Sequence, residues 1–189
     1  MALCRFLLVM LLAATVAPAA SSAAASDPLA KWFGSQTCPA LDGLYGTKQP
    51  PPVKTGTDDL VVRIPESVLP ELKQSMTVPW YVYDPHTRTA LSHIGIDSGV
   101  VDTLRVVSGP PPRSVPNVDL SDAHTKSGLK LGASAASVVR TLGKPLVIRA
   151  CGMERYEYND TSDPNAEPND LDFTIKDGRV IEIVHTVSG

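Results

Sequence analysis

The residues of this chain best suited to nucleophilic or metal chemistry are three cysteines and four histidines. Thiols and imidazoles act in proteins as nucleophiles, general bases and zinc ligands. The histidines, His86, His93, His124 and His185, are scattered, and the chain has no C-x-x-C, H-E-x-x-H, G-x-S-x-G or G-x-G-x-x-G spacing. We therefore predict no catalytic residue, no metal site and no cofactor.

The densest group of oxygen ligands lies in residues 159–172, NDTSDPNAEPNDLD. Calcium takes such ligands, but the segment lacks the turn glycine and terminal glutamate of an EF-hand, and two prolines interrupt it. A solvated acidic loop and a loop that docks onto a basic partner are the other interpretations. We assign four of its carboxylates to partner binding: Asp160, Asp163, Glu167 and Asp170.

A second candidate surface is the aromatic run Trp80-Tyr81-Val82-Tyr83. On a strand, Trp80 and Val82 face one way while Tyr81 and Tyr83 face the other. One pair is expected in the core, and the other is free to form a contact patch, since tyrosine and tryptophan dominate binding hot spots. We assign Tyr81, Tyr83 and Tyr156 to the partner-binding surface.

Residues 1–25 have the pattern of a secretory signal peptide. An early positive charge at Arg5 precedes an apolar run from Phe6 to Ala17, and small residues suited to cleavage follow. The run is shorter than the roughly 20 residues that a membrane-spanning helix needs, which disfavours the alternative of a retained anchor. We expect a secreted or periplasmic protein without a membrane span.

Cys38 and Cys151 are the cysteines outside this leader. Two thiols in an oxidising compartment most often form one disulfide, so we predict a Cys38–Cys151 bond. The alternative is a reactive thiol at either position with a histidine base, and no local signature supports it.

The charge balance bears on the class of partner. The chain has 17 Lys and Arg against 20 Asp and Glu, a net charge of −3. A nucleic acid or an anionic membrane would require a basic surface, so both are disfavoured as partners. Another envelope or extracellular protein is the expected partner.

Composition divides the rest of the chain into four parts. Residues 26–57 read as an irregular arm, 58–108 as a β-rich lobe, 109–126 as a proline-rich linker and 127–189 as an α+β lobe. In the last part, Ser134 and Gly143 are typical N-cap and C-cap residues of an amphipathic helix. Strands follow, and Asp177-Gly178 predicts a hairpin between the last two. The expected fold class is therefore α+β, with a short helix packed on an antiparallel sheet after a β-rich half.

The C-terminal part also resembles a known family. The residues concerned are Gly128 to Gly132, Val138-Val139, Leu142-Gly143-Lys144-Pro145, Tyr156-Glu157-Tyr158 and Phe173 to Val180. In this order they are similar to BamE/SmpA-like modules, which share their architecture with the β-lactamase inhibitor proteins. The resemblance implies a non-catalytic envelope module that presents its sheet or loops to a protein.

These observations favour a secreted or periplasmic, non-enzymatic protein-binding module of the inhibitor or immunity type. Two alternatives stay open: a small envelope hydrolase that uses cysteine or histidine chemistry, and a calcium-dependent binding protein. The element order also allows residues 58–108 to be a degenerate second copy of the C-terminal module.

Overall fold

The computed structural model describes residues 27–34, 38–42, 49–69, 79–96, 99–159 and 169–188. The proposed signal peptide, residues 1–25, lies outside the described residues. So do three of the acidic residues assigned to partner binding: Asp160, Asp163 and Glu167.

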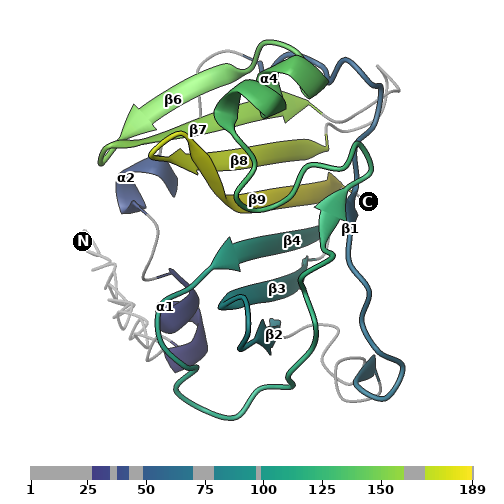
Figure 1. Ribbon diagram of the computed structural model, residues 1–189, viewed down its shortest axis with the longest axis vertical. Coiled ribbons are helices and arrows are strands. Elements are labelled where there is room, and N and C mark those ends of the chain that lie inside the picture. The colour runs from purple at the N-terminus through teal and green to yellow at the C-terminus, as the bar shows by residue number, and fades with distance from the viewer. Residues whose placement is uncertain are drawn as a thin grey trace, which may run out of the picture.

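A seven-stranded antiparallel sheet forms the body of the protein (Figure 1). Its strands are β2 (Trp80–Asp84), β3 (Thr89–Ile96), β4 (Gly99–Val106), β6 (Leu146–Ala150), β7 (Met153–Asn159), β8 (Asp170–Lys176) and β9 (Arg179–Ser188). They lie in the order β2-β3-β4-β9-β8-β7-β6, so β2 and β6 are the two edges. The strands β1 (Leu60–Val61) and β5 (His124–Thr125) form a separate two-stranded sheet.

The expectation of an α+β fold is wrong. The chain is mostly β, and its helices are short. The physical reason is the pairing of β4 with β9, which runs from Gly99 opposite Ser188 to Arg105 opposite Glu182. This pairing joins strands from residues 58–108 and 127–189 into one sheet, which provides most of the regular structure.

One face of the sheet carries the apolar core. Val82, Leu91, Leu104 and Ile183 are buried on neighbouring strands β2, β3, β4 and β9. Helix α4 (Ala135–Leu142) covers the β7–β9 end of this face with its buried Val138 and Leu142. The segment around β1 and β5 covers the β2–β4 end, and Leu60 and Leu131 pack against both parts of the core.

The caps of α4 confirm the helix expected between Ser134 and Gly143. The Ser134 hydroxyl accepts a hydrogen bond from the Ser137 amide at 3.1 Å, and Gly143 has a φ of 99°. A positive φ of this kind favours glycine, because other residues are strained there. The predicted hairpin is also confirmed, since Asp177 and Gly178 have φ values of 50° and 73° between β8 and β9.

The second face of the sheet is covered by the arm that precedes the strands. Helix α1 (Pro28–Gly34) buries Leu29 and Phe33 against Tyr81, Tyr83 and Ala90. Helix α2 (Pro39–Asp42) follows near β6, and the two helices lie on the opposite side of the sheet from α4 (Figure 1). The strand β2 is therefore buried on both faces.

Two buried arginines tie this arm to the sheet. The guanidinium of Arg105 donates to Glu182 Oε1 and to the carbonyl oxygen of Phe33 in α1, the latter at 2.5 Å. The guanidinium of Arg155 donates to Glu157 Oε1 at 2.8 Å and to the carbonyl oxygen of Leu41 in α2 at 2.6 Å. Buried charges need such partners, so each arginine links a sheet carboxylate to one helix of the arm.

No helix in the described part of the chain is long and apolar enough to cross a membrane.

Candidate functional site

The predicted disulfide between Cys38 and Cys151 is confirmed. The two Cα atoms lie 6.0 Å apart, and the bond joins positions 113 residues apart in the sequence. Cys38 is buried beside α2, and Cys151 is in the turn between β6 and β7. With both residues oxidised, neither offers a thiolate. A disulfide of this kind fits an oxidising compartment.

The three tyrosines assigned to partner binding are all buried. Tyr81 and Tyr83 are 5% and 7% exposed because α1 lies over them. Tyr156 lies on the other face of the sheet, in the core beneath α4 and its flanking segments, and its hydroxyl donates to Glu154 Oε2 at 3.0 Å. The three side chains therefore do not come together on one surface.

Asp170 is the acidic candidate that the structure describes. It begins β8 opposite Asn159, and burial raises its pKa, with the Glu157 carboxylate adding to the effect. Its neighbour Asp172 faces the same side of the sheet, directly opposite Glu157. Burial, with the Glu157 carboxylate adding to the effect and Arg155 opposing it, raises the pKa of Asp172 to about 8.

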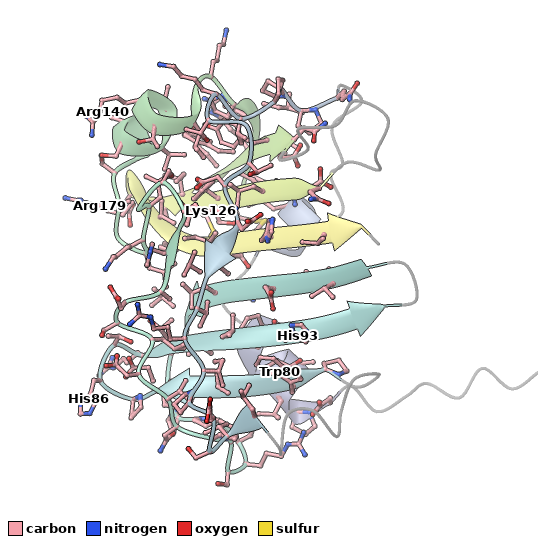
Figure 2. The ribbon with its side chains drawn as sticks, turned by 90° about the vertical axis from the view of Figure 1, so that its right-hand side faces the viewer. Trp80, His86, His93, Lys126, Arg140 and Arg179 are labelled. Carbon is pink, nitrogen blue, oxygen red and sulfur yellow. A yellow bond between two sulfur atoms is a disulfide. The ribbon has the colours of Figure 1, made fainter. Side chains whose placement is uncertain are left out.

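A group of half-buried aromatic and charged side chains lies elsewhere, at the end of the sheet where β2 begins. The indole of Trp80 stacks on the imidazole of His93, with ring centroids 4.7 Å apart and 17° between the planes. His93 Nδ1 lies 2.7 Å from Asp102 Oδ1 on the next strand. Figure 2 shows Trp80 and His93 side by side on this face of the sheet.

Buried and paired groups continue the row across the sheet. Asp102 lies directly opposite His185 on β9, and His185 Nε2 is 3.9 Å from Asp59 Oδ1. Asp59 also pairs with Lys126, beside β5. The side chain of His185 is 6% exposed, whereas those of His93 and Asp102 are 29% and 32% exposed. The accessible part of the row is thus Trp80, His93 and Asp102.

Apolar side chains flank this row at the strand ends. Val100 lies opposite Val187, and both face the same side of the sheet as Asp102 and His185. Val187 is 37% exposed, and Val100 is half-buried. We call Trp80, His93, Asp102, Val100 and Val187 the aromatic face. It combines a stacked aromatic pair, one carboxylate and an apolar border on a rigid sheet.

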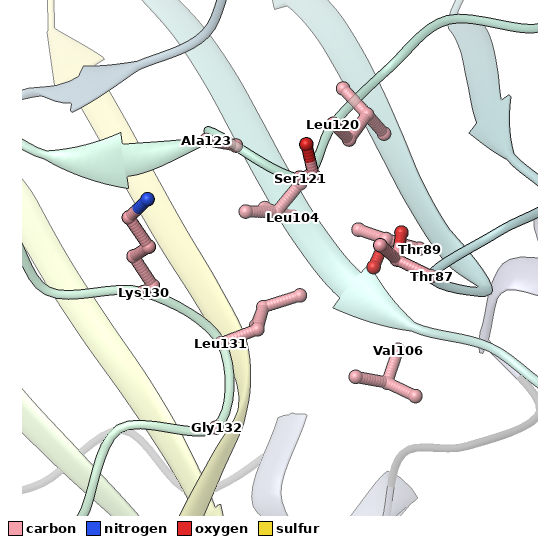
Figure 3. A pocket seen from close by; sticks show the side chains of 10 residues that line it. All are labelled: Thr87, Thr89, Leu104, Val106, Leu120, Ser121, Ala123, Lys130, Leu131 and Gly132. Atoms are coloured by element: carbon pink, nitrogen blue, oxygen red, sulfur yellow. The ribbon is translucent and has the colours of Figure 1, made fainter.

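A cavity of about 300 Å³ opens at the other end of the same sheet face (Figure 3). The lining residues are Thr87, Thr89, Leu104, Val106, Leu120, Ser121, Ala123, Lys130, Leu131 and Gly132. The charged one, Lys130, is exposed and pairs with Asp122 at 2.9 Å. The other polar groups of the lining are the hydroxyls of Thr87, Thr89 and Ser121, and no buried charge lies among the lining residues.

Metal chemistry finds no support among the placed side chains. In the ranges that the structure describes, no group of three or more His, Cys, Asp or Glu residues could hold a metal ion. His93 has Asp102 as its partner, while His86 and His124 lie on other segments. Of the segment considered for calcium, residues 159–172, positions 160–168 lie outside the described part of the chain.

Sequence reasoning missed the aromatic face because its members come from four separate strands. Trp80, His93 and Asp102 come together only through the registers of β2 with β3 and of β3 with β4. The one local signal was the alternation in Trp80-Tyr81-Val82-Tyr83, which separates Trp80 from the tyrosines. Comparisons of the chain with protein-family models, with curated proteins and with solved structures find no match.

Proposed function

We propose that this protein is a non-enzymatic protein-binding module that docks a partner through the aromatic face. The observation that carries the proposal is the Trp80–His93 stack, fixed by the His93–Asp102 hydrogen bond and accessible at the end of the sheet. A tryptophan that is already held in place loses little conformational entropy on binding.

The composition of the aromatic face supports the same function. Tryptophan is among the residues most enriched at binding hot spots, and apolar borders exclude water from them. Asp102 and His93 supply hydrogen-bonding groups that set orientation. Val100 and Val187 supply the border at the strand ends.

The compartment belongs to the proposal as well. We propose that residues 1–25 are a signal peptide and that the protein acts in the periplasm or outside the cell. The Cys38–Cys151 disulfide supports an oxidising location, where such bonds persist.

We further propose that residues 127–187 form a module of the BamE and β-lactamase-inhibitor type. The support is the element order, in which α4 is followed by the strands β6, β7, β8 and β9, each paired with the next. A module of this type would act as an inhibitor or immunity protein, by covering a surface of its partner rather than by chemistry.

The test compares variants of the protein in capture experiments from envelope extracts. Immobilised wild type, Trp80→Ala, Val187→Glu and Val139→Glu are probed in parallel, and the retained proteins are quantified by mass spectrometry. Val139 is 38% exposed on α4, and Val187 is 37% exposed on the aromatic face, so the two glutamate variants are matched in exposure.

The proposal predicts a protein that wild type and Val139→Glu retain and that Trp80→Ala and Val187→Glu lose. Val187→Glu controls for misfolding of Trp80→Ala. A charged residue at the exposed position 187 perturbs the fold less than removal of the partly packed Trp80 indole does. Equal retention by all four proteins would contradict a docking role for the aromatic face.

A further inference from the structure

Described residues line the cavity at the end of the sheet opposite the aromatic face. Residues 70–78, 97–98 and 160–168, which lie outside the described chain, join it at the other end of the sheet, where β2, β4 and β8 begin. Residues 1–26, 35–37 and 43–48 adjoin α1 or α2, and these helices lie on the opposite face of the sheet (Figure 1). The cavity is therefore remote from the points where the description of the chain stops.

Most of the lining is apolar. The side chains concerned are Leu104, Val106, Leu120, Ala123 and Leu131. Leu104 is 1% exposed, whereas Val106 is 39% exposed at the rim. An apolar cavity of about 150 Å³ is large enough to bind benzene. The volume of about 300 Å³ found here can therefore hold a single ring with a short chain.

One buried hydroxyl faces into this apolar space. Thr89 is 4% exposed and lies directly opposite Val106, so both side chains are on the same side of the sheet. Within the described chain the Thr89 hydroxyl makes no hydrogen bond, whereas the Ser121 hydroxyl donates to Asp119 Oδ1 at 2.5 Å. Figure 3 shows Thr89 across the cavity from Leu131. A buried polar group without a partner is costly, so a ligand that bonds to Thr89 removes this cost.

The charge at the cavity is already balanced. Lys130 is the charged residue of the lining, and its Nζ lies 2.9 Å from Asp122 Oδ1. A charged ligand would lose hydration in the cavity without gaining an unpaired counter-charge. The cavity therefore favours a neutral molecule.

We infer that this cavity is a binding site for a small neutral molecule that is mostly apolar and has one hydroxyl, such as a phenol or an alkyl alcohol. The apolar walls supply affinity by removing the ring or chain from water, and the Thr89 hydroxyl sets the orientation of the ligand. The site is at the other end of the sheet from the aromatic face, so it does not depend on the function proposed above.

The experiment uses three probes that share one apolar body. They are 4-ethylphenol, ethylbenzene, which lacks the hydroxyl, and 4-ethylbenzoate, which replaces the hydroxyl with a charged carboxylate. Binding to the full protein is followed by NMR through the ¹³C-labelled methyl groups of Leu104, Val106 and Leu131, which locate the probe.

Two pairs of variants test the anchor and the space. Thr89→Val removes the hydroxyl at nearly constant size, and Thr103→Val makes the same change at a buried threonine on the opposite face of the sheet. Val106→Trp fills part of the cavity, and Val187→Trp adds the same side chain at a strand position of matched exposure, 37% against 39%. Val106 is exposed, so its variant keeps the test available even if Thr89→Val does not fold.

We expect 4-ethylphenol to give saturable shifts of the three methyl resonances. Thr89→Val should raise its Kd about fivefold, which is the effect of one lost neutral hydrogen bond, and should not weaken the binding of ethylbenzene. Val106→Trp should weaken both neutral probes about tenfold or more, and 4-ethylbenzoate should bind wild type about tenfold more weakly than 4-ethylphenol. Thr103→Val and Val187→Trp should bind as wild type does.

Several results would overturn the inference. The first is the lack of saturable shifts in the cavity methyls at millimolar 4-ethylphenol. The second is an equal effect of Thr89→Val and Thr103→Val, and the third is equal binding of 4-ethylphenol and 4-ethylbenzoate. Loss of binding in Val187→Trp with none in Val106→Trp would assign the probe to the aromatic face instead.

Discussion

The indole ring of Trp80 lies parallel to the imidazole ring of His93, 4.7 Å from it, and the same imidazole is held by Asp102. Stacking fixes the plane of the His93 ring, and the hydrogen bond fixes its rotation. The three side chains come from three strands, so the sheet itself sets their geometry.

The Asp102 hydrogen bond predicts the tautomer of His93. An ionised carboxylate only accepts hydrogen bonds, so neutral His93 must carry its proton on Nδ1 and leave Nε2 as an acceptor. Long-range ¹H–¹⁵N NMR correlations should show this form in the wild type. In Asp102→Ala the Nε2–H form should grow, at a stability cost of about 1 kcal/mol or less because the pair is partly exposed. An unchanged tautomer in Asp102→Ala would show that the carboxylate does not orient the ring.

The buried Arg105–Glu182 pair predicts a large loss of stability. Arg105→Ala leaves Glu182 as an unpaired buried charge and removes the bond to the Phe33 carbonyl. The free energy of unfolding, measured with urea, should fall by about 3–5 kcal/mol. Arg149→Ala is the control, since this arginine pairs with Glu154 on the surface and should cost less than about 1 kcal/mol. Similar losses of unfolding free energy in Arg105→Ala and Arg149→Ala would contradict the larger contribution expected of the buried pair.

The disulfide predicts a similar loss by a different route. Replacing both Cys38 and Cys151 with serine removes the covalent link between two positions that are 113 residues apart in the sequence. The unfolded chain then gains conformational entropy, so the free energy of unfolding should fall by about 2–5 kcal/mol. Adding a reductant to the wild type should reproduce the effect, and the serine variant should not respond to it. A reductant response in the serine variant would refute this explanation.

The raised pKa of Asp172 predicts how the free energy of unfolding changes with pH. Its pKa is about 8 in the folded protein and about 4 in the unfolded chain, because burial and Glu157 disfavour the charged form. Between these values the folded state holds a proton that the unfolded state has lost, so the contribution of Asp172 to stability falls as pH rises through this window.

Asp172→Asn should remove that contribution. The variant should gain stability relative to wild type as pH rises from about 4 to about 8, and the difference should level off above this range. The variant must be compared with wild type at each pH because Glu154 also contributes to the pH dependence of stability. Hydrogen bonds from Arg149 and Tyr156 lower the pKa of Glu154, so its contribution to stability rises with pH, whereas that of Asp172 falls. A pH-independent difference in melting temperature between the two proteins would count against the raised pKa.

Locally encoded features could be predicted from the sequence. The caps at Ser134 and Gly143 delimit α4, and Asp177-Gly178 marks the β8–β9 hairpin, because each signal acts on its own few residues. The Cys38–Cys151 bond followed from counting the cysteines that lie outside residues 1–25.

Features that depend on long-range pairing could not be predicted in this way. Nothing local to β4 or β9 indicates that these strands are neighbours, so the single large sheet and the class of the fold were missed. Tyr81 and Tyr83 have a contact-surface pattern, but α1 covers them from a distant part of the chain. The aromatic face was missed for the same reason, since it exists only once the registers of β2, β3, β4 and β9 are known.

The most direct test of the aromatic face is site-specific photo-crosslinking in the cells that produce the protein. The photoreactive residue p-benzoylphenylalanine replaces Val187 in one variant and Val139, which has matched exposure on α4, in the other. A partner seated on the aromatic face should give one discrete crosslinked protein from position 187 and none from position 139. A crosslink from position 139 alone, or none from either position, would contradict the proposed docking site.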